Sequence, residues 1–257
     1  MEVIVIIQQI LRNKLRAISF FFFLTISFLS FSQNLKVEYK ATFDADIFEN
    51  STKMSSKQKR MFKQMQKRLK ESVENQKIVL YTKSENQFLL VVEDQMSIDG
   101  QFNSYIGVSL LNLHSYVYGQ TDSIVLGYTK EESFIVKYEN RFVEWEITDE
   151  SKNILGFKCF KAIPKYLQSY EERELNSYPT EAWFAPSINR RGGPIKYSNL
   201  PGLILEVKSV KSTITAKLIE DIVEDKEVPQ IDKKIITELQ AYKKAKATGA
   251  AIESRMK

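Results

Sequence analysis

A stretch rich in glycine and proline, residues 192–207, most constrains how this chain can fold. It reads GGPIKYSNLPGLILEV and passes from turn-forming residues directly into an apolar run. Pro201-Gly202 predicts a type II turn, because proline presets φ at the first central position and glycine accepts positive φ at the second. The apolar run Leu203–Leu205 is typical of a strand covered on both faces. The predicted turn motif consists of Gly193, Pro194, Leu200, Pro201 and Gly202.

The first 32 residues predict a secretory signal peptide. A basic segment, Arg12–Arg16, precedes an uncharged apolar run, Ala17–Phe31, and small residues follow at Ser30 and Ser32. The run is shorter than the roughly 20 apolar residues that span a bilayer, which favours cleavage over an uncleaved anchor. We expect a signal peptide over residues 1–32, one mature domain over residues 33–257, no transmembrane segment after cleavage, and a periplasmic or secreted protein.

The composition limits the chemistry that the chain can carry. Its 257 residues include one histidine, His114, and one cysteine, Cys159. With a single histidine, the chain cannot form a metal site from several histidines, and a histidine-paired catalytic triad is not expected. Cys159 has no partner for an intramolecular disulfide and is expected to be a small buried apolar residue. We therefore predict no catalytic residue, no metal ligand and no cofactor.

The charge pattern argues against nucleic acid as a partner. The formal net charge is +5, with 37 basic and 32 acidic residues mixed along the chain. A small, dispersed excess of this kind does not make a nucleic-acid-binding surface.

Most of the chain alternates between apolar and polar residues with the period of β-strands. An amphipathic helix is expected over Lys53–Asn75, whose opposite face is basic, and a second helix over Ile231–Lys246. The favoured interpretation of the basic helix is that it lies on a sheet with its lysines in water; contact with a membrane surface or an acidic partner is the alternative. Strands are expected at Leu35–Ile47, Ile78–Tyr81, Phe88–Val92, Ser109–Tyr118, Ser123–Tyr128, Ser133–Tyr138, Phe142–Thr148, Asn153–Ala162, Leu203–Val210 and Thr213–Val223.

This pattern predicts an α+β protein that is mainly antiparallel β. The expected architecture is a curved meander sheet with an N-terminal amphipathic helix and a C-terminal helix. It is analogous to the half-barrel of periplasmic lipoprotein carriers, whose concave side holds acyl chains. The sequence leaves open whether the inner face of the sheet is open or filled.

Several segments together resemble one family of exported proteins. They are Trp145–Ile147, Asn153–Ala162, Glu181–Phe184, Gly193-Pro194 and Leu200–Leu205, in that order. In this order they resemble the GLPGLI family of secreted Bacteroidetes proteins over about Trp145–Val207. The chain departs from the family name at Asn199, where the name has glycine; asparagine also tolerates the left-handed region. The resemblance implies an exported, mostly β protein and transfers no catalytic residue.

Four residues near the turn motif are the candidate ligand-binding residues. Trp183 and Phe184 can fill a core or line a groove. Arg190 and Arg191 form a pair that is able to hold a carboxylate or phosphate, although an exposed basic loop is the simpler interpretation.

These observations favour an exported, non-catalytic binding or interaction protein of the cell envelope, and not an enzyme. Its expected partner is an envelope protein, or an apolar ligand or peptide held on the concave sheet. The alternatives are an envelope enzyme that uses acidic residues and a structural assembly partner. Two carboxylates facing each other, one with a raised pKa, would mark the enzyme.

Overall fold

The computed structural model describes residues 34–43, 55–83, 87–93, 104–119, 124–130, 132–139, 143–166 and 179–255. The predicted signal peptide lies outside these residues. The helices are α2 (Ser56–Glu74), α3 (Ser104–Leu110) and α4 (Glu238–Arg255). The strands are β1 (Asn34–Phe43), β2 (Lys77–Thr82), β3 (Phe88–Glu93), β4 (Tyr116–Gly119), β5 (Ile124–Tyr128), β6 (Phe134–Glu139), β7 (Val143–Ile154), β8 (Phe157–Tyr166), β9 (Pro179–Ala185), β10 (Leu203–Ser209), β11 (Ser212–Ile222) and β12 (Lys234–Thr237).

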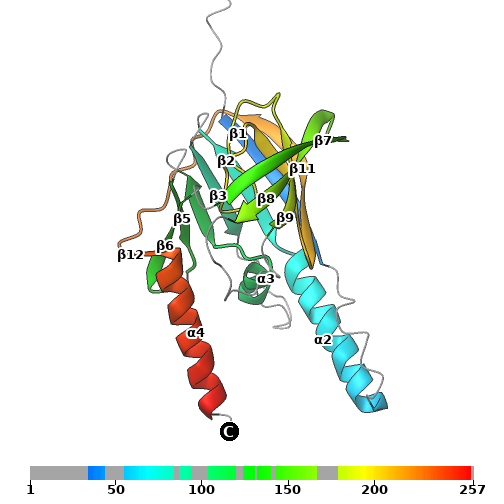
Figure 1. Cartoon of the computed structure of the whole chain (residues 1–257), viewed down its shortest axis with the longest axis vertical. Coiled ribbons are helices and arrows are strands. Elements are labelled where there is room, and N and C mark those ends of the chain that lie inside the picture. The colour runs from blue at the N-terminus through cyan, green and yellow to red at the C-terminus, as the bar shows by residue number, and fades with distance from the viewer. Residues whose placement is uncertain are drawn as a thin grey trace, which may run out of the picture. The chain divides into compact units, whose positions relative to one another are not determined.

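The described strands form one sheet in the order β12-β6-β5-β4-β3-β2-β1-β11-β10-β9-β8-β7. The first strand therefore lies in the middle, between β2 and β11, and a meander runs outward on each side of it (Figure 1). Every neighbouring pair is antiparallel except β12 with β6. This confirms the predicted fold class, a mainly antiparallel meander sheet with a helix near each end.

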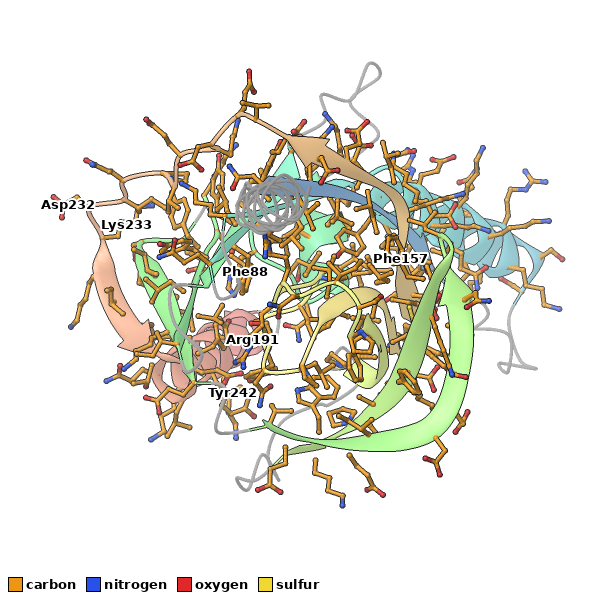
Figure 2. All side chains as sticks on the ribbon, turned by 90° about the horizontal axis from the view of Figure 1, so that it is seen from above. Phe88, Phe157, Arg191, Asp232, Lys233 and Tyr242 are labelled. Atoms are coloured by element: carbon orange, nitrogen blue, oxygen red, sulfur yellow. The ribbon has the colours of Figure 1, made fainter. Side chains whose placement is uncertain are left out.

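A short connection forces the sheet to curl. β6 ends at Glu139 and β7 begins at Val143, yet the two strands lie near opposite ends of the strand order. Four residue steps span at most about 14 Å, so the ends of these two strands must come close together. The sheet accordingly bends round on itself, as Figure 2 shows from above.

The inside of this curl is occupied by the segment between β9 and β10, residues 186–202, which we call the inner loop (Figure 2). Its residues Gly192–Ser198 are all buried. Ile195 and Leu200 pack with Phe184 and Ile204 in one apolar cluster. At the centre of the sheet, the buried hydroxyl of Tyr39 donates to the carbonyl of Ile204 at 2.8 Å.

The filled interior corrects one expectation of the sequence analysis. A cavity of only about 10 Å³ lies between the inner loop, the α3–β4 connection and strands β9–β11, which is at most room for one water molecule. An acyl chain does not fit there, so at this place among the described residues the analogy with lipoprotein carriers extends to the curved sheet but not to a ligand cavity.

Several predicted elements differ in detail. Asn153–Ala162 is not one strand: Leu155 and Gly156 have φ of 51° and 85° and form the tight turn between β7 and β8, as a two-residue hairpin with positive φ at both positions requires. The predicted strand Ser109–Tyr118 begins instead with the end of α3. The predicted C-terminal helix starts with strand β12, and α4 extends to Arg255.

The turn at Pro201-Gly202 is tighter than predicted. The amide of Gly202 donates to the carbonyl of Leu200 at 2.9 Å, which closes a three-residue turn around Pro201 in place of a type II turn. Gly202 has φ of 149°, and a Cβ there would lie 2.4 Å from the carbonyl oxygen of Ala185. Glycine is therefore required both by the backbone angle and by the close approach of β9.

We expect Gly202→Val to lower the free energy of unfolding by more than about 3 kcal/mol, because it adds a clash with backbone to an unfavourable φ. Gly156→Ala is the matched control. Gly156 also has positive φ, but a Cβ there meets nothing within 4 Å, so we expect a loss of about 1 kcal/mol. Urea denaturation measures both, and equal losses would show that the contact with Ala185 is unimportant.

Candidate functional site

The inner loop places a lysine among aromatic and amide groups. Lys196, which is buried, directs its Nζ to Oδ1 of Asn112 at 2.8 Å. The same ammonium lies 4.7 Å from the ring centroid of Tyr138 on β6 and 3.5 Å from its hydroxyl oxygen. A buried charge needs such partners, since its transfer from water is otherwise costly. Lys196 thus joins the inner loop to the β6 side of the sheet.

The chain's single histidine belongs to the same polar cluster. His114 is half-buried, with Nδ1 2.8 Å from the hydroxyl of Thr129 and Nε2 2.6 Å from the hydroxyl of Tyr138. Burial, assisted by the positive charge of Lys196, lowers the pKa of His114 from 6.5 to about 3. The imidazole is therefore neutral at neutral pH.

Two further side chains fasten the inner loop to other elements. The hydroxyl of Tyr197 lies 2.9 and 2.8 Å from the two carboxylate oxygens of Glu238, the first residue of α4. Asn199 accepts from the indole Nε1 of Trp145 at 2.7 Å and donates to the carbonyl of Val143 at 3.1 Å. Asn199, the position that departs from the GLPGLI name, thus anchors the loop to edge strand β7.

A charged network surrounds the indole of Trp183 on β9. Lys152 of β7 places Nζ 4.2 Å from the centroid of the ring and 2.5 Å from Oε1 of Glu206. The indole N–H donates to Oε1 of Glu181 at 3.3 Å, and Nζ of Lys161 lies 3.5 Å from the other oxygen of Glu181. Lys152 and Glu181 therefore contact the indole directly. Glu206 and Lys161 contact it through these two residues.

The structure separates the four predicted ligand-binding residues. Trp183 and Phe184 are consecutive in β9 and so point to opposite faces of the sheet: Trp183 toward the charged network, Phe184 toward Ile195 and Leu200. Arg190 and Arg191 are both partly buried in the inner loop, and Nη1 of Arg190 donates to the carbonyl of Asn189 at 2.9 Å. Among the described residues, none of the four lines the small interior cavity.

Sequence reasoning missed the polar cluster of Lys196, Tyr138, His114, Asn112 and Thr129. These residues come from separate parts of the chain, and no spacing in the sequence connects them. The available signal was Lys196 itself, a charged residue inside the buried GGPIKYSNLPG stretch, which must have a partner wherever it is buried. The contact between Tyr197 and Glu238 was not predicted for the same reason, because the two residues lie far apart in the sequence.

The described groups show limited acid–base chemistry. Where a described carboxyl group departs from its ordinary pKa, at Glu38 and Glu146, hydrogen bonds from lysines lower the pKa. Cys159 is buried, and burial raises the pKa of its thiol. Within the described residues, no group of three or more histidine, cysteine, aspartate or glutamate side chains is placed to hold a metal ion. The described helices include none long and apolar enough to cross a bilayer.

Comparison with known proteins gives a family. The family model described as "N-glycanase peptide, N-terminal domain", that of PNGase F-II, matches residues 51–244. Two crystal structures of PNGF-II are similar, each at 17% identity and a TM-score of 0.47; they cover 82% and 83% of this chain but 33% and 32% of their own. An uncharacterized conserved protein from Thermus thermophilus is similar at 8% identity and a TM-score of 0.32, over 80% of this chain and 91% of that one. No curated protein matches.

The chain belongs to the family of N-glycanase N-terminal domains, because the model matches more than half of its length. It spans about a third of the length of the PNGF-II structures. The expectation of a non-catalytic binding protein, and with it the prediction that the chain is not an enzyme, is therefore wrong: its family is that of a domain of an N-glycanase. Sequence reasoning failed here because it looked only for a catalytic set within this chain, whereas the family follows from a match to a family model over residues 51–244.

The lowered pKa of His114 predicts a pH-dependent stability. Between about 3 and 6.5, the unfolded chain binds a proton at His114 that the folded chain does not bind. The free energy of unfolding therefore falls as pH is lowered through this window, by on the order of 2 to 4 kcal/mol. His114→Gln should flatten the dependence, as measured by urea denaturation from pH 3 to 7. Parallel curves for the two proteins would refute a strongly lowered pKa.

The anchor at Asn199 predicts a loss of stability on truncation. Asn199→Ala removes both side-chain hydrogen bonds to β7 and leaves the indole N–H of Trp145 without its acceptor. We expect the free energy of unfolding to drop by about 1 to 3 kcal/mol. Ser187→Ala, at an exposed position of the same inner loop, should change it little. A thermal melt with no difference between the two variants would show that the anchor does not stabilise the fold.

Proposed function

We propose that this chain is the N-terminal domain of an exported N-glycanase system and takes part in removing N-linked glycans from polypeptides. The observation that carries the proposal is the match of an N-glycanase N-terminal domain model over residues 51–244. The predicted signal peptide supports a periplasmic or secreted place of action, where glycosylated proteins from outside the cell can be met. We further propose that the chain is also related to the GLPGLI family, through the resemblance over Trp145–Val207, a stretch that includes β8, β9, the inner loop and parts of β7 and β10.

Within the chain we assign contact with the glycan to the network around Trp183. A sugar offers apolar C–H faces and many hydroxyl groups. The indole ring of Trp183 suits the first, and the carboxylate and ammonium groups of Glu181, Glu206, Lys152 and Lys161 suit the second as acceptors and donors. Lys152 covers the ring at 4.2 Å. Trp183 is itself only 8% exposed and packs in the main core. The Lys152 side chain is 36% exposed, and its flexible stem must move aside before a sugar stacks on the indole.

Glycan release tests the proposal. The full chain is incubated with a denatured N-glycosylated protein, alone and together with PNGF-II from which the N-terminal domain has been removed, and free glycans are measured by mass spectrometry. We expect the chain to raise the rate of release in at least one of these mixtures. An unchanged rate in both would contradict the proposed function.

A matched pair of variants tests the assignment to Trp183. Glu206→Gln removes a charge that Lys152 and Thr215 contact, and we expect about a tenfold lower rate of glycan release, as for a lost charged hydrogen bond. Glu220→Gln makes the same change on β11, where Glu220 contacts Lys36, and should leave the rate unchanged. Equal rates for the two variants would place the glycan contact elsewhere.

A further inference from the structure

Helix α2 is built to remain helical where it has little support from the sheet. Its N-terminus carries a capping box: the Ser55 side chain accepts from the amide of Gln58, and the Gln58 side chain accepts from the amide of Ser55. Ion pairs Lys67–Glu71 and Lys70–Glu74, each four residues apart, follow along the helix. Such local interactions stabilise a helix without tertiary packing. Within α2 only Ser72 and Val73, in its last turn, are buried.

An apolar stripe continues beyond the packed end of this helix. Leu69 and Val73 contact the main core, and Met65, Met61 and Phe62 extend the same face outward at helical spacing. Met61 is 61% exposed and Met65 is 40% exposed. Together with Gln64 and Arg68, these three residues line an open pocket of about 330 Å³. Figure 1 shows α2 running out from the sheet.

The rest of the helix surface is strongly basic. Between Ser56 and Glu74 there are two acidic residues, Glu71 and Glu74, against a larger set of basic ones: Lys57, Lys59, Arg60, Lys63, Lys67, Arg68 and Lys70. The projecting part before Glu71 carries no acidic side chain. A partner for the stripe must therefore offer apolar groups and negative charge together.

We propose that the stripe Met61–Phe62–Met65 is a docking site for an acidic amphipathic segment of a partner polypeptide. Methionine suits such a site because its flexible, polarizable side chain adapts to the apolar side chains of a partner, and an amphipathic helix presents anchors at the same spacing. The basic residues, Arg68 at the pocket foremost, pair with the partner's carboxylates. This interaction is additional to the proposed action on glycans and does not depend on it.

Other occupants fit less well. A second copy would bring two basic helices together, and like charges at close range repel. A flat lipid surface cannot lie along the stripe, because Leu69 and Val73 on the same face pack on the protein body, which would collide with it. Nucleic acid supplies charge but no apolar anchors for the methionines. A single helical segment is narrow enough to avoid this collision. Its carboxylates can pair with the basic residues of α2, and its apolar side chains can pack on the stripe.

Binding of a designed peptide tests the proposal. The probe is a fluorescent helical peptide with leucine at positions i, i+3, i+4 and i+7 and glutamate elsewhere, and fluorescence anisotropy follows its binding to the full chain. The double variant Met61→Ser/Met65→Ser should weaken binding about tenfold or more, from lost apolar contact. Val223→Ser, at an exposed valine outside α2, should not change it. Thermal melts should match the parent, because both methionines are exposed.

A charge-reversal variant distinguishes binding at this site from non-specific binding. Arg68→Glu should weaken binding of the glutamate peptide about tenfold and strengthen binding of the same peptide with lysine in place of glutamate. Three outcomes would overturn the proposal. They are no binding of the glutamate peptide, equal binding by the methionine variant, and tighter binding to phosphatidylglycerol vesicles than to the peptide, which would assign the stripe to lipid. None of these outcomes bears on glycan release.

Discussion

The hydrogen bond from the buried hydroxyl of Tyr39 to the carbonyl of Ile204 lies where three parts of the fold meet. Tyr39 belongs to the central strand, and Ile204 is the second residue of β10, the strand that follows the inner loop. The amide of Ile204 donates to the carbonyl of Gly192 within that loop at 3.0 Å. The inner face of a sheet that curls this far is shielded from water. The chain fills that face with its own backbone, and backbone groups buried there need partners. Much of the unusual sequence between β9 and β10 meets this demand.

The same demand explains why the polar cluster is found where it is. Packing a loop, with its peptide groups and Lys196, inside a sheet brings charge into the interior. Asn112 and Tyr138 contact that charge, and Glu238 accepts from Tyr197 at the start of α4. These contacts fix the inner loop to the α3–β4 connection, to β6 and β7, and to the first residue of α4, so the start of α4 is coupled to the interior of the sheet. The neutral histidine beside Lys196 follows from the same burial.

The fold was more predictable than the site. Alternation of apolar residues located most strands, and helical spacing located α2, because both depend on local burial. The Leu155-Gly156 hairpin was missed because a leucine with positive φ leaves no mark in the sequence. The glycine and proline residues of the GGPIKYSNLPG stretch predicted tight turns, but they did not predict that the segment lies inside the curled sheet. The polar cluster and the network around Trp183 join strands far apart in sequence, and only the register of the sheet brings them together. The relation to an N-glycanase domain came from the match to a family model, because it depends on comparison with other sequences and not on one motif with recognisable chemistry.

The central position of β1 has a consequence for how the molecule is made. Its two neighbours are β2, residues 77–82, and β11, residues 212–222, which follows every other described strand except β12. Synthesis proceeds from the N-terminus, so the edge of β1 that pairs with β11 stays unpaired until residues 212–222 have been made. Pairing over such a sequence distance is slow, and open strand edges invite wrong partners. Until β11 is made, the open edge of β1 is therefore the part of the sheet most exposed to wrong pairing.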